Sequence, residues 1–496
     1  MRTVIQPQMK LGESNIATIE LDPKSRDDLP QILRGLQYIY TTAELREAVF
    51  AILGEVMPQG KDGKASADTG RPGMEQWKIL VLGVLRLGLN ADYDRIQELA
   101  NQHSTIRQML GHSDWTDETY YELQTLKDNL RLFTPEILER ISREVVRAGH
   151  ALVKKSPDEA LNARSDSFVV ETDVHFPTDT NLLLDAIRKV IETCAALSRE
   201  NAVSDWRQSA YNIRQFKKLL RKIQRLRHST SKDEDKQKAK HNEIEEAHRS
   251  FLEMAEVFLE RARNTRVLLQ FDYAVPPVLF EDLEAYMAHA ERQIEQIRRR
   301  VLQGETIAHS EKVFSIFEPH TEWISKGKAG VPVELGLRVT VIEDQHGFIL
   351  NHQVMQKLTD DRIAVTIVEQ TKAHFPQISS VSFDKGYHSP QNQIDLKAIL
   401  DLVVLPKKGK LSKADAQREQ DPEFIRLRRK HSAVESAINA LEVHGLDRCP
   451  DHGIEGFERY VALSVLARNT QQLGAVLRRQ EKEQAERKRE PYKKAA

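Results

Sequence analysis

Two acidic residues in the second half of the sequence stand where a metal site could be built. The segment ISSVSFD (378–384) is a short apolar run, typical of a strand, that ends on Asp384 and is followed at once by a Lys-Gly turn. The later segment RLRRKHSAVESAINALEVHG (426–445) has a helical pattern and carries Glu435. An acid at the carboxyl end of a strand and another on a later helix are how proteins build carboxylate metal sites. These two residues are the first candidates for chemistry.

The helical segment also places cations beside its acid. An apolar stripe runs along it, and Gly445 marks its end. At about 100° per residue, the face beside that stripe collects Arg428, His431, Glu435, Asn439 and Glu442. His431 and Arg428 stand one and two turns before Glu435, so we expect both of them to hold a phosphate.

The order of these motifs resembles that of the DDE transposases of bacterial insertion sequences. SFDKGYHSP (382–390) is similar to the second-acid motif of that group, and KHSAVESAINALEVHGLDRC (430–449) is similar to its third-acid helix. GIEGFERYVALSVLARNTQQL (453–473) is similar to the closing helix of the group. The resemblance is closest to the ISNCY-type insertion-sequence transposases and covers about residues 70–475.

The resemblance implies both a fold and an activity. The fold is α/β: an RNase H-like mixed five-stranded sheet flanked by helices, with an all-α N-terminal domain and a long α-helical insertion after the first strand. The activity is that of a DNA transposase, which binds the terminal inverted repeats of its element and catalyses metal-dependent DNA strand cleavage and strand transfer.

The resemblance also requires a first acid on an early strand. ARSDSFVVETDVHFPTD (163–179) offers four acids, and the family motif aligns its first Asp with Asp166 and its turn with the closing PTD. Asp173 is the alternative, because it ends an apolar run. Along a single strand, Asp166 shares a face with Phe168 and Asp173 points the other way, so we expect Asp166 to be the first acid. The family more often has Thr at the position of Phe168.

Three carboxylates within a few ångströms of one another would repel at neutral pH unless divalent cations neutralised them. Hard oxygen ligands with no Cys among them select Mg²⁺, with Mn²⁺ as a substitute. Two such ions about 3.5–4 Å apart activate water or a DNA 3′-hydroxyl and stabilise the leaving 3′-oxygen. We therefore expect Asp166, Asp384 and Glu435 to be both metal ligands and catalytic residues, with two ions per active site.

Composition bounds the class of protein. The chain has 496 residues with 73 Lys and Arg against 74 Asp and Glu, so net charge says nothing about a nucleic-acid partner. Two distant cysteines, Cys194 and Cys449, favour a reducing cytosol over a disulfide framework. Residues 1–10 lack the apolar core of a signal peptide, and the most apolar run, 79–89, is too short to cross a bilayer. We expect a cytoplasmic, nucleoid-associated bacterial protein with no membrane partner.

Patterning along the chain predicts five parts. These are an N-terminal segment and linker (1–70), a helical DNA-binding domain (71–150), a catalytic core (151–180 and 304–475), a helical insertion (181–303) and a disordered charged tail (476–496). In the second part, the helical stretches 93–102 and 105–110 have helix–turn–helix spacing, which also occurs in ordinary helical bundles. The resemblance favours DNA binding there.

Five segments predict the strands of the sheet. They are the early segment with Asp166, the hairpin 333–342 and 348–353, the strand before Asp384, and the apolar run 400–405.

The insertion and the loop after it carry the cations expected to contact DNA. The stretch 206–228 holds eight Arg or Lys, and the sequence leaves open whether it is a solvated helical hairpin or a DNA clamp. The loop 307–330 mixes cations with Trp323, as phosphate-and-base contact loops do. The expected DNA contacts are Arg214, Lys218, Arg221, Arg225, Lys326 and Lys328.

Three functions are compatible with these motifs. A transposase would act on double-stranded DNA, both transposon ends and target, as a homodimer or larger assembly because it joins two ends. A metal-dependent endonuclease without strand transfer would use the same acids. A domesticated DNA-binding protein would have lost an acid, whereas all three candidates are present, so we expect the transposase.

Overall fold

The computed structural model describes residues 3–5, 14–56, 73–112, 119–200, 205–226, 233–269, 277–325 and 332–494. The chain divides into two compact units, one formed by Met1–Asp173 with Ile324–Ala496 and the other by Val174–Trp323. Each unit has its own hydrophobic core. Most of the predicted linker (58–73) and the predicted DNA contacts Lys326 and Lys328 lie outside the described residues.

One mixed sheet forms the centre of the first unit. Its main order is β2-β3-β1-β5-β6, with β4 also paired to β3 and β7 to β1. The strands are β1 (Leu161–Thr172), β2 (Glu322–Ser325), β3 (Val333–Glu343), β4 (Ile349–Met355), β5 (Ile378–Phe383), β6 (Leu402–Val404) and β7 (Arg448–Cys449). All five predicted strands are present, so the prediction of an α/β fold with a mixed sheet is confirmed. The short strands β2 and β7 are additions to it.

The register around β1 decides which side chains meet. β1 runs antiparallel to β3, with Asp166 opposite Val341, and parallel to β5, with Ser165 opposite Phe383. β5 ends at Phe383, and Asp384 comes directly after it. Because Ser165 pairs with Phe383, Asp384 lies beside Asp166. β1 itself continues past this point and pairs with β7 at Glu171.

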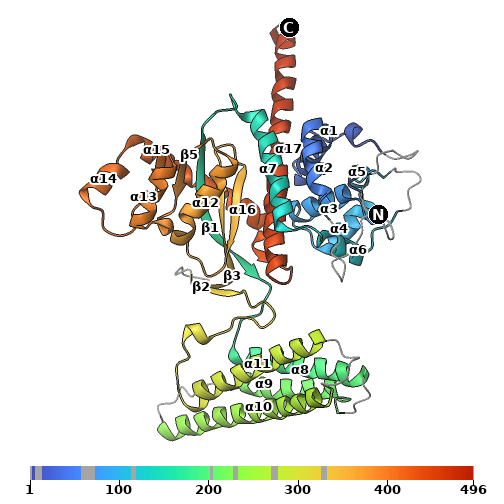
Figure 1. Ribbon diagram of the computed structural model, residues 1–496, viewed down its shortest axis with the longest axis vertical. Coiled ribbons are helices and arrows are strands. Elements are labelled where there is room, and N and C mark those ends of the chain that lie inside the picture. Colours follow the sequence, from blue (N-terminus) through green and yellow to red (C-terminus); the bar gives the residue numbers. More distant parts are fainter. Residues whose placement is uncertain are drawn as a thin grey trace. The chain divides into compact units, whose positions relative to one another are not determined.

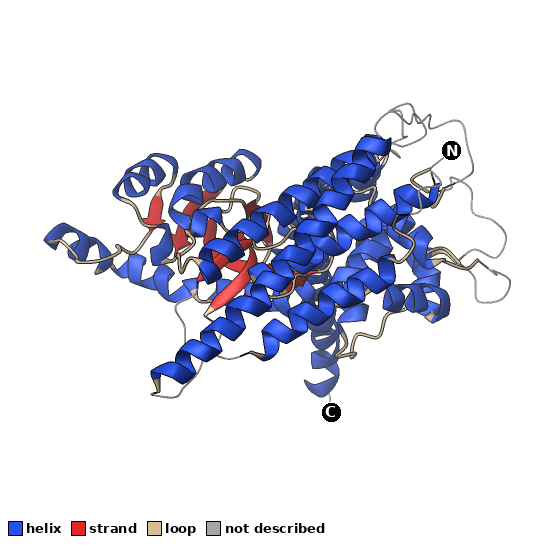
Figure 2. Cartoon of the chain, turned by 90° about the horizontal axis from the view of Figure 1, so that it is seen from below, coloured by secondary structure: helices blue, strands red, loops and turns tan. Residues whose placement is uncertain are grey.

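The first unit also contains many helices; Figure 2 shows the helices in blue and the strands in red. The N-terminal helices are α1 (Asp28–Thr41), α2 (Ala43–Leu53), α3 (Gln76–Gly88), α4 (Tyr93–Gln102), α5 (Ser104–Met109), α6 (Leu123–Leu130) and α7 (Pro135–Val153). The later helices are α12 (Asp360–His374), α13 (Pro390–Ile399), α14 (Lys413–Glu419), α15 (Pro422–His431), α16 (Ala433–Leu441) and α17 (Ile454–Lys494). The predicted helix–turn–helix pair forms α4 and α5. The N-terminal helices share one core with the sheet.

Helix α17 joins the N-terminal helices to the sheet. It packs against α1, α3, α7 and β4, and the Asn469 side chain bonds both the backbone N–H and the C=O of Ile349 on β4. Two glycines let α17 cross α1 backbone to backbone. A Cβ on Gly474 would lie 1.9 Å from the Gln31 carbonyl oxygen, and one on Gly35 would lie 2.2 Å from the Thr470 carbonyl oxygen. Any larger residue would force the two helices apart.

The second unit is a helical bundle of α8 (Asp179–Glu200), α9 (Ser209–Arg225), α10 (Glu234–Leu269) and α11 (Pro277–Ile297), which lie side by side in Figure 1. The rings of Phe216 on α9 and Phe251 on α10 stack at 4.4 Å inside it. The insertion predicted at 181–303 is therefore helical, with a packed core of its own.

Two predicted features differ in the structure. The segment around Glu435 is two helices, α15 and α16, which meet at Ser432, so its polar residues do not share one continuous helical face. The tail predicted to be disordered from residue 476 continues α17 as far as Lys494. In the described part of the chain, no helix is long and apolar enough to cross a membrane.

Candidate active site

Asp384 is held in place by the turn that follows β5. It caps that turn, its carboxylate accepting a hydrogen bond from the Gly386 N–H at 3.3 Å. Tyr387, in the same turn, is buried, and its hydroxyl bonds Thr340 Oγ1 on β3 at 2.8 Å. This bond ties the turn to the strand beside β1, so the position of Asp384 relative to Asp166 is fixed by the sheet.

Asp166 lies partly buried in an acidic environment. Its pKa is raised to about 6. Burial is the largest cause, a hydrogen bond from the Ser167 N–H lowers the pKa, and the negative charges of Asp384, Asp360 and Glu435 raise it. The bond from that N–H to Asp166 Oδ1 is 2.7 Å long. The structure therefore brings Asp166, Asp384 and Glu435 within electrostatic reach of one another, with Asp360 as a fourth acid.

Asp360 was missed by the sequence reasoning. It begins α12, and its Oδ1 accepts a hydrogen bond from Ser167 Oγ at 2.7 Å, while Arg338 approaches its Oδ2 at 3.8 Å. A Cβ on Gly386 would lie 3.1 Å from Asp360 Oδ2 and 3.7 Å from Asp384 Oδ2, so both carboxylates face the same small space. The only signal in the sequence was an acidic pair after Thr359, which is typical of any helix N-terminus.

Of the two residues expected to hold a phosphate, His431 lies near the acids and Arg428 does not. Burial lowers the pKa of His431, and the charges of Asp384 and Glu435 act in the opposite direction, so this ring lies near both acids. Its Nδ1 is 3.1 Å from Ser382 Oγ on β5, and its buried Nε2 has no partner. Arg428 is exposed and pairs instead with Glu419 on α14 at 3.5 Å. Glu435 lies in the first turn of α16 and is exposed.

The register separates Asp166 from Asp173. Asp173 comes one residue after the end of β1, seven positions beyond Asp166, which is about 23 Å along an extended strand. It is exposed and lies 3.5 Å from Arg448. The register therefore places Asp166, and not Asp173, beside Asp384.

The chemistry of the donor set fits Mg²⁺ or Mn²⁺, since every candidate ligand is a carboxylate oxygen. Among the residues that the structure describes, no three His, Cys, Asp or Glu side chains are already arranged to hold a metal ion.

The predicted DNA-contact residues of α9 lie on one exposed helix. Its sequence, SAYNIRQFKKLLRKIQR, contains no acid, and Phe216 and Leu220 bury its other side. In the described part of the chain, none of its exposed cations forms an ion pair with a described acid; these are Arg214, Lys217, Lys218, Arg221, Lys222 and Arg225. By contrast, many Arg and Lys of α10 and α11 pair with Glu, as Arg263 does with Glu291 at 2.6 Å.

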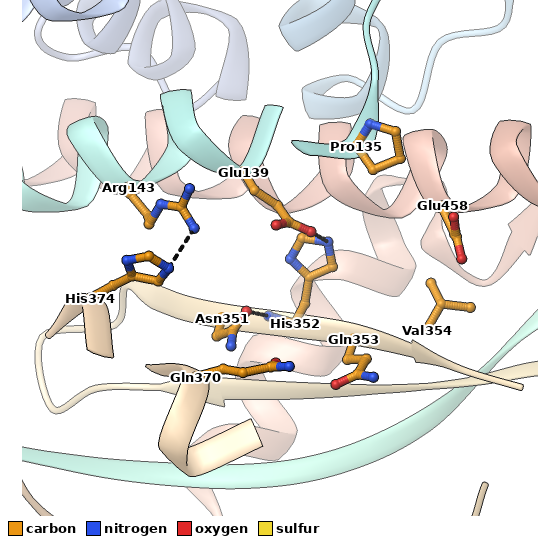
Figure 3. A pocket seen from close by; sticks show the side chains of 10 residues that line it. All are labelled: Pro135, Glu139, Arg143, Asn351, His352, Gln353, Val354, Gln370, His374 and Glu458. Carbon is orange, nitrogen blue, oxygen red and sulfur yellow. Dashed lines mark hydrogen bonds and ion pairs between the residues drawn. The ribbon is translucent and has the colours of Figure 1, made fainter. Parts of the chain in front are cut away.

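A separate cavity of about 410 Å³ lies where α7, β4, α12 and α17 meet (Figure 3). In Figure 3, the His352 ring points toward Glu139, 3.8 Å away, and Arg143 reaches the ring of His374 at 3.1 Å. Burial lowers the pKa of His352 to about 4, so this ring is neutral at pH 7. None of the predicted site residues lines this cavity.

Comparison of the chain with protein-family models, with curated proteins and with solved structures finds no match.

Proposed function

We propose that this protein is a DNA transposase of the DDE type, which cleaves and transfers DNA strands with divalent metal ions. The observation that supports the proposal is that Asp384 and Glu435 lie within electrostatic reach of Asp166, near the end of β5. These are the three acids that the motifs select, and they come from separate segments of the chain. Acids in such positions are common in α/β proteins one at a time, whereas a converging set is a much stronger indication.

An RNase H-like core is part of the same proposal. The mixed sheet, with its antiparallel hairpin and its parallel neighbour β5, supports this assignment. The helical insertion also begins shortly after the first strand, as the resemblance implies.

Each residue of the site would have its own role in metal or phosphate binding. Asp166 on β1 and Asp384 in the turn after β5 would supply two of the carboxylates, and Glu435 on α16 would supply the third. Two divalent ions, when bound, provide the activation of water or a 3′-hydroxyl and the stabilisation of the leaving 3′-oxygen. His431, whose Nε2 has no partner, is placed beside the acids to contact a phosphate oxygen.

DNA would be held by the unpaired cations of α9, which match a phosphate backbone without reading bases. Because transposition joins two DNA ends, the active form would be at least a homodimer on DNA.

The test uses the DNA that flanks the gene on both sides as substrate. The protein is incubated with this DNA and Mg²⁺, and then with pre-cleaved ends and a target plasmid. We expect cleavage at both ends followed by joined products. Cleavage without joining would favour the endonuclease, and specific binding without cleavage would favour a domesticated DNA-binding protein.

A further inference from the structure

A second candidate site lies within the helical unit, whereas Asp166, Asp384 and Glu435 belong to the other unit. It is a pocket of about 620 Å³, a volume in the range of small-molecule sites. Three aromatic side chains, those of Phe176, Phe314 and Trp323, line one part of it. The ring centre of Trp323 lies 5.6 Å from that of Phe176 and 5.7 Å from that of Phe314. Phe176 is 60% exposed as a residue, so this aromatic part of the pocket is open to a ligand.

The polar part of the pocket contains an amide without partners. Gln293 on α11 lines the pocket and is fully buried, yet neither its Oε1 nor its Nε2 has a hydrogen-bond partner. A buried amide normally finds partners, because leaving both ends unpaired destabilises the fold. Here the unpaired donor and acceptor belong to one residue, and that residue lines the cavity that a ligand would fill.

Two further groups complete the pocket. His248 has its Nδ1 2.8 Å from the Ile244 carbonyl oxygen, which can only accept, so Nδ1 carries the proton and Nε2 remains an acceptor in the neutral ring. Lys312 is exposed at the pocket, and no described acid pairs with it. Arg300, by contrast, is held by both carboxylate oxygens of Asp179, at 2.6 and 3.0 Å.

We propose that this pocket binds a nucleobase. Aromatic faces stack on the flat ring of a base, and the side-chain amide of Gln or Asn pairs with a base edge that presents a donor beside an acceptor. Lys312 would meet the phosphate attached to that base. The base can come from two sources, a free nucleotide or an unpaired base of a nucleic-acid strand. The inference goes beyond the proposed function and stands without it.

The test measures binding to the full chain by calorimetry in EDTA, so that no cleavage takes place and the result is separate from that of the proposed function. The probes are AMP, GMP, CMP and UMP, and a short DNA duplex with one extrahelical adenine. The same duplex fully paired, and with an abasic site in place of the adenine, serves as control.

The decisive variant is Gln293→Leu, which keeps the volume and removes both hydrogen-bonding atoms. Because the amide is unpaired in the free protein, this variant should melt at the same temperature as the parent or higher. The matched control is Gln393→Leu, which removes another buried amide with both ends unpartnered, on α13 outside the pocket.

We expect Gln293→Leu to weaken binding of the base roughly tenfold or more and Gln393→Leu to leave it unchanged. Binding of a free mononucleotide identifies the first source. Tighter binding of the extrahelical adenine than of the abasic duplex, with no mononucleotide binding, identifies the second. The proposal is overturned if no probe binds through its base, or if the two variants behave alike.

Discussion

Replacing Asp166 with Asn should make the metal-free protein more stable at neutral pH, although it removes a predicted catalytic group. The folded protein holds the Asp166 pKa at about 6, against an ordinary value of 3.8, a difference worth about 3 kcal/mol at 1.36 kcal/mol per pH unit. The folded state binds the proton more tightly than the unfolded state. The free energy of unfolding therefore falls as the pH rises from about 4 to 6, and the full cost is present at pH 7.

Asn carries no charge and can still accept the hydrogen bond from the Ser167 N–H. Asp166→Asn should thus raise the free energy of unfolding by up to about 3 kcal/mol at pH 7 and by little at pH 4. The control is Asp173→Asn, an exposed site where a change of no more than about 0.5 kcal/mol is expected.

The readout is native-state hydrogen exchange of the β1 amides in EDTA, which reports the sheet-containing unit apart from residues 174–323. Adding Mg²⁺ should then protect β1 in the parent protein, since binding to the folded state alone stabilises it, and should do so much less in Asp166→Asn. If Asp166→Asn is no more stable than the parent at pH 7, the folded protein does not hold the Asp166 pKa above its ordinary value, and this description of its environment is wrong.

Two further predictions follow from charges elsewhere in the chain. Changing the exposed cations of α9 to Gln should weaken DNA binding across sequences and leave the fold intact. The slope of log affinity against log salt should become shallower by about one for each lost phosphate contact. An unchanged slope would show that α9 does not touch DNA. The residues to change are Arg214, Lys218, Arg221 and Arg225. Burial holds the His352 pKa at about 4, below its ordinary value of 6.5, so the unfolded state binds the proton more tightly than the folded state. The free energy of unfolding should therefore fall by roughly 3 kcal/mol as the pH is lowered from 6.5 to 4. His352→Gln should flatten that part of the curve, and an unchanged curve would mean that other groups cause it.

The strands were accessible from the sequence because each is an apolar run between turn residues, whereas their order in the sheet was not predicted. Their register was not, since it depends on pairing between segments far apart in the chain. That register is what sets Asp384 beside Asp166. The face argument for Asp166 relied only on alternation along one strand, and the structure adds the distance along β1 that separates Asp166 from Asp173.

The missed and altered features have local causes. Asp360 looks like an ordinary acid at a helix start, and only the fold brings it to Gly386. The break at Ser432 has no Gly or Pro to announce it, so the stretch from 422 to 441 has the pattern of one helix. The charged tail lacks apolar residues, which predicts disorder, but it is rich in Glu, Lys, Arg, Gln and Ala. These residues extend a helix that is already nucleated at little cost.

The most direct test of the proposed metal site is cleavage of the gene's flanking DNA by four single variants in Mg²⁺. Asp166→Asn, Asp384→Asn and Glu435→Gln should each reduce cleavage by several orders of magnitude while leaving DNA binding largely intact, because the binding contacts lie elsewhere. Asp173→Asn should cleave like the parent. Full activity in any of the first three variants, or its loss in Asp173→Asn alone, would contradict the assignment of this site.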